Sequence, residues 1–207
     1  MATISQTSPR LISHQTQKVA SQYWPFSDQT TDKIKKIAIG VIAALMLLPL
    51  SSLLEHKIID LMKAFNIHLT APQEVIQLWN YIGGFSSKFL SLTIKTALLG
   101  YIVIFGPIIE EYLFRDKFHS WLEDKTEKSK TILNKAFRVG ANGLIFGACH
   151  LSPTQGWTNI PIFIVISCVG FALAALREAT GDTIAPKAAH IVNNGVATTQ
   201  FLLGMEV

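Results

Sequence analysis

The sequence predicts an all-α fold, a polytopic bundle of about five transmembrane helices with one amphipathic segment. Two observations support this prediction. Hydrophobic residues make up 49% of the 207-residue chain, charged residues only 15%, and the mean hydropathy is +0.35, which is more apolar than most soluble domains of this size. The apolar residues are also gathered in blocks, several of them close to the roughly 20 residues that one span requires. A lipid bilayer is therefore the expected solvent of the chain.

Each apolar block is predicted to form a membrane helix. The candidate spans are residues 37–54, 89–109, 139–151, 160–176 and 184–203. The segment 55–87 mixes apolar and charged residues, which predicts an amphipathic stretch on the membrane surface. Residues 1–36 form a polar tail without the short basic stretch and apolar core of a cleavable signal. We therefore divide the chain into this tail and a transmembrane helical domain, 37–207.

The positive charge of the chain indicates membrane topology and not a nucleic-acid partner. The 18 Lys and Arg residues are dispersed and mostly lie between apolar blocks, although the net charge is +4. With a cytoplasmic N-terminus, most of them fall on the cytoplasmic side, in the tail, the segment 115–138 and the last interhelical turn, as the positive-inside rule requires. We expect an integral protein of the plasma (inner) membrane. The sequence predicts no oligomeric state.

The second apolar block ends in a glycine-proline pair followed by two glutamates. Gly106 and Pro107 predict a break, with the helix restarting at Pro107 and carrying Glu110 and Glu111 in its first turn. Glu111 and Arg115 stand four residues apart, the spacing of an intrahelical ion pair. If Arg115 neutralises Glu111, partial desolvation leaves Glu110 as a usable general base. Taken alone, this motif equally fits a solvated cluster at the end of a span.

Two further motifs place histidines in apolar helices. His150 follows Phe146 by one turn, on a helix whose Gly143 and Gly147 fit close helix packing; the alternative is a packing histidine bonded to a neighbouring helix. His190 and Asn194 share a helix face, so both can donate hydrogen bonds to one point; the alternative is a polar contact between helices. The remaining histidines are expected in solvated positions: His14, His56, His68 and His119.

The order of these motifs, Glu-Glu-x-x-x-Arg, Phe-x-x-x-His and His-x-x-x-Asn on three helices, resembles the CPBP family of CAAX prenyl endopeptidases and bacteriocin-processing intramembrane proteases. The resemblance covers roughly residues 90–203, and every motif position is filled. It implies an intramembrane endopeptidase that hydrolyses a peptide bond in a peptide or protein tail. The alternative is a non-catalytic membrane scaffold or self-immunity protein that uses the same polar cluster for helix packing.

The resemblance leaves two mechanisms open. In a metalloprotease, Glu110, His150 and His190 would hold zinc and leave one position for water. Without a metal, Glu110 and His150 would activate water, while His190 and Asn194 would donate to the oxyanion. The second mechanism is slightly favoured. In both, the supporting residues are Glu111, Arg115 and Phe146.

A common site meets one geometric difficulty. Glu110 and His190 are predicted near cytoplasmic helix ends, whereas His150 would lie roughly 18 to 25 Å deep at 1.5 Å per residue. A single site therefore requires that the helix after Pro107 enters the membrane, or that the third span is tilted or begins in the headgroup region.

Overall fold

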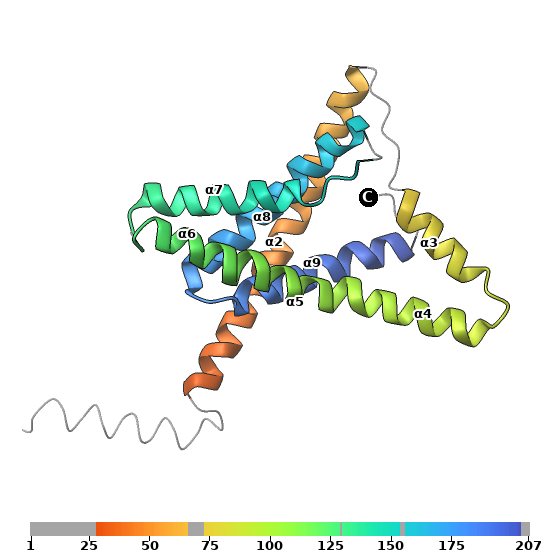
Figure 1. The fold of residues 1–207 in the computed structure, drawn as a ribbon, viewed down its shortest axis with the longest axis horizontal. Helices are drawn as coiled ribbons and strands as arrows, with labels where there is room; N and C mark the ends of the chain where they lie inside the picture. Colours follow the sequence, from red (N-terminus) through yellow and green to blue (C-terminus); the bar gives the residue numbers. More distant parts are fainter. Residues whose placement is uncertain (1–27, 66–72, 129, 154–155, 204–207) are drawn as a thin grey trace, which may run out of the picture. The chain divides into compact units, whose positions relative to one another are not determined.

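The computed structural model describes residues 28–65, 73–128, 130–153 and 156–203, and the regular structure in these ranges is entirely helical (Figure 1). This confirms the predicted all-α class. The described residues of the predicted domain 37–207 belong to one compact unit. Residues 1–27 of the predicted tail lie outside the described residues, and residues 28–36 form the first turns of a helix.

The helices follow one another along the chain with short connections. They are α2 (Asp28–Ala64), α3 (Gln73–Gly83), α4 (Lys88–Gly100), α5 (Gly106–Glu111), α6 (His119–Lys125), α7 (Ile132–Ala148), α8 (Asn159–Thr180) and α9 (Ile184–Leu202), with a 3-10 turn, η3 (Gly156–Thr158), before α8. Two π-helical segments, η1 (Tyr101–Phe105) and η2 (Tyr112–Phe118), join α4, α5 and α6. The result is one helix of 38 residues, Lys88–Lys125.

Three helices of the described chain are long and apolar enough to cross a membrane: Asp28–Ala64, Lys88–Lys125 and Asn159–Thr180. They contain the predicted spans 37–54, 89–109 and 160–176. The predicted spans 139–151 and 184–203 are also largely helical, as α7 and α9, but these helices are not among the three.

Ionisable and amide side chains lie inside this fold, while many large apolar side chains lie on its outside. Glu111, Arg115, His119 and Asn142 are fully buried, whereas large apolar side chains along α2, α4 and α7 are exposed. Ionisable residues of membrane helices face the interior of the bundle in this way, and an extended apolar exterior marks a lipid-facing surface. The distribution is that of an integral membrane protein.

The predicted helix break at Gly106 and Pro107 is wrong, because the helix passes through both residues. A proline inside an α-helix lacks an amide hydrogen and clashes with the preceding turn. Here the preceding turn is π-helical: the N–H of Gly106 donates to the carbonyl of Tyr101, five residues back, and this i→i+5 pattern adds a residue to the turn. Glu110 and Glu111 therefore lie within a long helix, not in its first turn.

The predicted amphipathic segment 55–87 is divided between two helices. Residues 55–64 continue α2 without a break, and α3 is a separate helix that ends at Gly83. No glycine or proline lies between residues 54 and 64, so the helix runs past its apolar block. Residues 66–72 lie outside the described part of the chain.

Helices α7 and α8 pack closely through glycines, as predicted for Gly143 and Gly147. A Cβ atom built on Gly143 would lie 2.7 Å from the backbone nitrogen of Phe171, and one built on Gly147 would lie 2.9 Å from the carbonyl oxygen of Phe163. On α8, a Cβ on Gly170 would lie 2.9 Å from the Cα of Gly143. The two backbones are therefore too close for side chains at these positions.

We expect Gly143→Ala to destabilise the protein by about 1–3 kcal/mol, the usual cost of overpacking. Gly140→Ala is the matched control, because a Cβ there meets nothing within 4 Å and alanine is the better helix former by about 1 kcal/mol. Thermal unfolding in detergent measures both variants. An equal midpoint for the two would contradict the packing described here.

Candidate active site

Glu110 and His150 do not lie at different depths, as the sequence predicted, because the helix that carries Glu110 continues through Pro107. Glu110 lies 15 residues before the end of α6 at Lys125, and His150 lies 18 residues after the start of α7 at Ile132. Helices α6 and α7 run side by side in opposite directions (Figure 1). At 1.5 Å per residue, Glu110 and His150 are therefore roughly 22 and 27 Å from the end at which α6 connects to α7. They lie at similar depths without any special tilt.

The structure brings Glu110, His150 and His190 together from three separate segments of the chain. The Oε2 atom of Glu110 lies 3.8 Å from Nε2 of His150 and 3.6 Å from Nε2 of His190. This oxygen is buried and has no hydrogen-bond partner. The side chains of Glu110 and His150 are 31% and 33% exposed, while that of His190 is 5% exposed. The cluster is thus shielded on one side and accessible on the other.

The other ring nitrogen of each histidine is bonded to an acceptor. Nδ1 of His150 lies 2.7 Å from the carbonyl oxygen of Phe146. Nδ1 of His190 lies 2.8 Å from Oε1 of Glu111, a carboxylate that also pairs with Arg115. Because a carbonyl and an ionised carboxylate can only accept, both Nδ1 atoms carry the proton. In the neutral rings both Nε2 atoms are therefore acceptors that face the carboxylate of Glu110, and no donor lies between them.

Glu111 and Arg115 form the intrahelical pair that their spacing predicts. Nη1 of Arg115 donates to Oε1 of Glu111 at 3.1 Å, and both side chains are 0% exposed. Nη2 of Arg115 donates to the carbonyl oxygen of Gly170 at 3.0 Å. Since η2 carries Arg115 and α8 carries Gly170, this arginine ties two helices together while it neutralises Glu111.

Phe146 is the apolar centre of the same cluster. Its side chain is 1% exposed, and the guanidinium carbon of Arg115 lies 4.3 Å from its ring centroid, within the range of a cation–π interaction. The ring centroids of His150 and His190 lie 4.6 and 5.7 Å away. The ring of Phe146 thus contacts both imidazoles and the guanidinium group of Arg115.

Asn194 lies one helical turn after His190, and its amide makes a contact that the proline explains. Nδ2 of Asn194 donates to the carbonyl oxygen of Ile102 at 3.1 Å. In an α-helix or a π-helix this carbonyl would accept from Gly106 or Pro107, but Gly106 donates to Tyr101 and proline has no N–H. The asparagine therefore satisfies a carbonyl that the helix leaves without a donor, and the second N–H of its amide is not used by this bond.

Asn142, which is not among the predicted site residues, supports the second π-helical segment. It is 0% exposed, and its Nδ2 donates to the carbonyl oxygen of Phe114 at 2.6 Å. The same carbonyl accepts from the backbone N–H of His119, five residues on. Asn142 lies four residues before Phe146 and eight before His150, so this spacing on one helix face was the available signal.

His119 is not solvated as predicted, because it belongs to a second buried polar cluster. It is 0% exposed, and its Nε2 lies 3.1 Å from Oε1 of Glu178. The same oxygen accepts from Nε of Arg138. His56 is exposed, as predicted, and His14 and His68 lie outside the described residues. The available signal was its spacing, because His119 follows Arg115 by four residues and therefore lies on the same face of the helix.

In the predicted zinc set, the distances from Oε2 of Glu110 to the two histidine nitrogens, 3.8 and 3.6 Å, are close to those that zinc requires. About 2 Å from a tetrahedral ion, ligand atoms lie roughly 3.4 Å from one another. Each histidine approaches Glu110, but in the described residues the one group of three His, Cys, Asp or Glu side chains whose ligand atoms all lie within 4.8 Å of one another is His119, Glu123 and Glu178. For all three side chains to bind one ion, the Nε2 atoms of His150 and His190 would have to lie closer to each other.

Comparison with known proteins agrees with the motifs. The family model described as type II CAAX prenyl endopeptidase Rce1-like matches residues 92–196, which is half of the chain and includes all three motifs. No curated protein and no solved structure matches the chain. The match confirms the resemblance to the CAAX prenyl endopeptidases that the motif order indicates. The chain belongs to the Rce1-like family of type II CAAX prenyl endopeptidases.

Proposed function

We propose that this chain is an intramembrane endopeptidase in which Glu110 and His150 activate the hydrolytic water. The observation that carries the proposal is the position of Oε2 of Glu110, 3.8 Å from Nε2 of His150 and 3.6 Å from Nε2 of His190. Facing acceptors without a donor are costly in an apolar environment. Two such acceptors can instead bind a water molecule, which donates a hydrogen bond to each of them.

One water molecule can donate to both proposed bases. Two acceptors 3.8 Å apart can each lie about 2.8 Å from a single oxygen, the usual length of such a hydrogen bond. The water would attack the scissile carbonyl carbon while one of its protons passes to the Glu110–His150 pair. The pair then returns this proton to the leaving amide nitrogen as the carbon–nitrogen bond breaks.

His190 and Asn194 are the proposed donors to the oxyanion. In the neutral ring Nε2 of His190 is an acceptor, so His190 would donate to the oxyanion only after the ring takes up a second proton from solvent, and the carboxylate of Glu111, 2.8 Å from Nδ1, would offset the charge of that ring. Asn194 uses one amide hydrogen on Ile102 and keeps the other. Donors held in advance stabilise the developing charge without reorganisation.

Glu111, Arg115 and Phe146 are proposed as positioning residues. Arg115 fixes the Glu111 carboxylate, which in turn orients His190, and Phe146 contacts both histidine rings. None of the three needs to touch the substrate. We further propose that the protein lies in the plasma membrane with its N-terminus in the cytoplasm and cuts a peptide or protein tail, in agreement with the name of its family.

Glu110→Gln and His150→Ala should each reduce cleavage by about 10²–10⁴-fold, the usual contribution of general acid–base catalysis. The assay follows cleavage of a peptide that ends in a prenylated Cys-a-a-X motif, with purified protein in lipid nanodiscs.

The matched controls are Glu127→Gln and His56→Ala. Both side chains are exposed, and Nδ1 of His56 lies 2.7 Å from the carbonyl oxygen of Ser52, the same local bond that His150 makes with Phe146. Full turnover in the Glu110 and His150 variants would end the proposal. Destabilised variants and an intact protein without proteolysis would favour the non-catalytic scaffold.

Arg115→Met should destabilise the protein by about 3–5 kcal/mol, because it leaves the buried Glu111 carboxylate without its cation. Lys128→Met is the matched control: Lys128 pairs with Asp124 over the same four-residue spacing, at 3.5 Å, but the two side chains are 79% and 68% exposed. An exposed pair is worth at most about 1 kcal/mol. Chemical denaturation in mixed micelles measures the free energy of unfolding of both variants. An equal decrease in the two would show that the buried ion pair of Arg115 does not stabilise the fold.

Chelation should leave the activity unchanged, since the proposed steps use only side chains and water. The test measures turnover before and after dialysis against a strong chelator, with metal analysis of the same samples. Loss of turnover that added zinc restores would instead support Glu110, His150 and His190 as metal ligands.

A further inference from the structure

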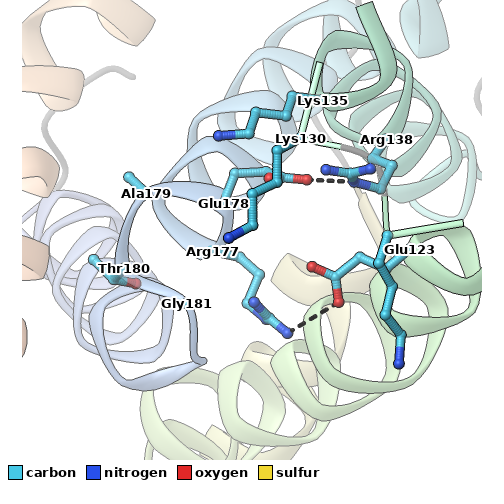
Figure 2. A pocket seen from close by; sticks show the side chains of 10 residues that line it. Glu123, Lys130, Lys135, Arg138, Arg177, Glu178, Ala179, Thr180 and Gly181 are labelled. Atoms are coloured by element: carbon cyan, nitrogen blue, oxygen red, sulfur yellow. Dashed lines mark hydrogen bonds and ion pairs between the residues drawn. The ribbon is translucent and has the colours of Figure 1, made fainter. Parts of the chain in front are cut away.

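A cavity of about 490 Å³ lies where α6 and α8 end and α7 begins, apart from the candidate active site. Its volume falls within the range of roughly 300–1,000 Å³ that is typical of ligand pockets. Figure 2 shows its lining side chains directed around a common opening. The charged lining residues are Glu123, Lys128, Lys130, Lys135, Arg138, Arg177 and Glu178. Basic residues therefore outnumber acidic ones in the wall.

The acidic residues of the cavity are already paired with arginines. Arg138 donates to Glu178, and Nη2 of Arg177 donates to Oε2 of Glu123 at 3.5 Å, as the dashed lines in Figure 2 show. Each pair cancels one positive and one negative charge of the wall. A metal ion held by Glu123, Glu178 and His119 would have to compete with both arginines, so the network does not favour a cation.

Lysines supply the remaining charge of the cavity. No ion pair is found for Lys130 or Lys135 within the described part of the chain, and Lys128 pairs with Asp124 only at the exposed surface. In Figure 2 Lys130 runs beside Glu178 toward Arg177, and Lys135 lies above it at the edge of the cavity. Two ammonium groups at a polar cavity attract an anion with several oxygen atoms, of which phosphate is the usual example.

Large apolar side chains flank these lysines. Ile132, Leu133 and Phe137 are 87%, 79% and 55% exposed, and they share the first two turns of α7 with Lys135. An anion that also carries acyl chains would satisfy both the lysines and these apolar residues. A basic pocket between membrane helices, on the side richest in Lys and Arg, is a recognised setting for acidic headgroups.

We propose that this cavity binds the headgroup phosphate of an anionic phospholipid, held by Lys130 and Lys135, with the acyl chains along the exposed apolar residues of α7. The site is separate from the proposed catalytic centre, because Glu110 lies 15 residues from the end of α6, or roughly 22 Å along the helix. The proposal therefore stands independently of the proposed function.

The test uses the full chain in detergent and counts bound lipid by native mass spectrometry during titration with phosphatidylglycerol or phosphatidylcholine. The wild type should bind phosphatidylglycerol at a saturable site and phosphatidylcholine weakly. Lys130→Gln with Lys135→Gln should weaken phosphatidylglycerol binding roughly tenfold or more, because each lysine near a lipid phosphate contributes to its attraction. The matched control is Lys57→Gln with Lys63→Gln, which removes the same charge from exposed positions on α2.

Further variants and a free anion separate the possible outcomes. Lys130→Arg with Lys135→Arg should retain binding, which distinguishes the loss of charge from a folding defect, and thermal unfolding without lipid should be equal in all variants. Equal phosphatidylglycerol binding in the cavity and control variants would overturn the proposal. Saturation by inorganic phosphate at the same affinity as the lipid would also overturn it, because the apolar residues would then contribute nothing.

Discussion

The candidate active site depends on one buried carboxylate oxygen. Oε1 of Glu111 accepts from Arg115 at 3.1 Å and from Nδ1 of His190 at 2.8 Å. An unpaired carboxylate inside an apolar bundle would cost several kcal/mol, so both contacts must be kept when the helices assemble. Because Arg115 also bonds to the carbonyl of Gly170, this oxygen connects the long helix to α9 directly and to α8 through the arginine.

The same connection orders the groups for which we propose a catalytic role. His190 can present Nε2 to Glu110 only in the orientation that Glu111 imposes, and Phe146 packs against that ring and the ring of His150. The close contact of α7 with α8 at Gly143 and Gly170 brings Phe146 to the arginine. Packing, charge pairing and the position of the proposed chemistry are therefore parts of one arrangement.

The motifs and the helical class could be predicted from the sequence, because apolar blocks and i, i+4 spacing are local properties. The π-helical segments could not, since each is supported by an asparagine from a distant helix: one satisfies a carbonyl that has no backbone donor, and the other adds a second donor to a carbonyl that already has one. Asn194 does the first for Ile102, and Asn142 does the second for Phe114. The same dependence on tertiary contacts explains why Pro107 was mistaken for a helix break.

The two buried polar clusters differ in a way that separates structural from chemical roles. In the cluster of His119, Arg138 and Glu178, a carboxylate oxygen faces an arginine and a histidine within bonding distance, so its charge is compensated. In the other, Oε2 of Glu110 faces the Nε2 atoms of two histidines whose protons are held elsewhere. A cluster whose charges are paired stabilises the fold. Two acceptors that face each other are favourable only when a molecule such as water donates a hydrogen bond to them. This difference, rather than the mere presence of charged groups at depth, is the physical reason to locate hydrolysis at Glu110.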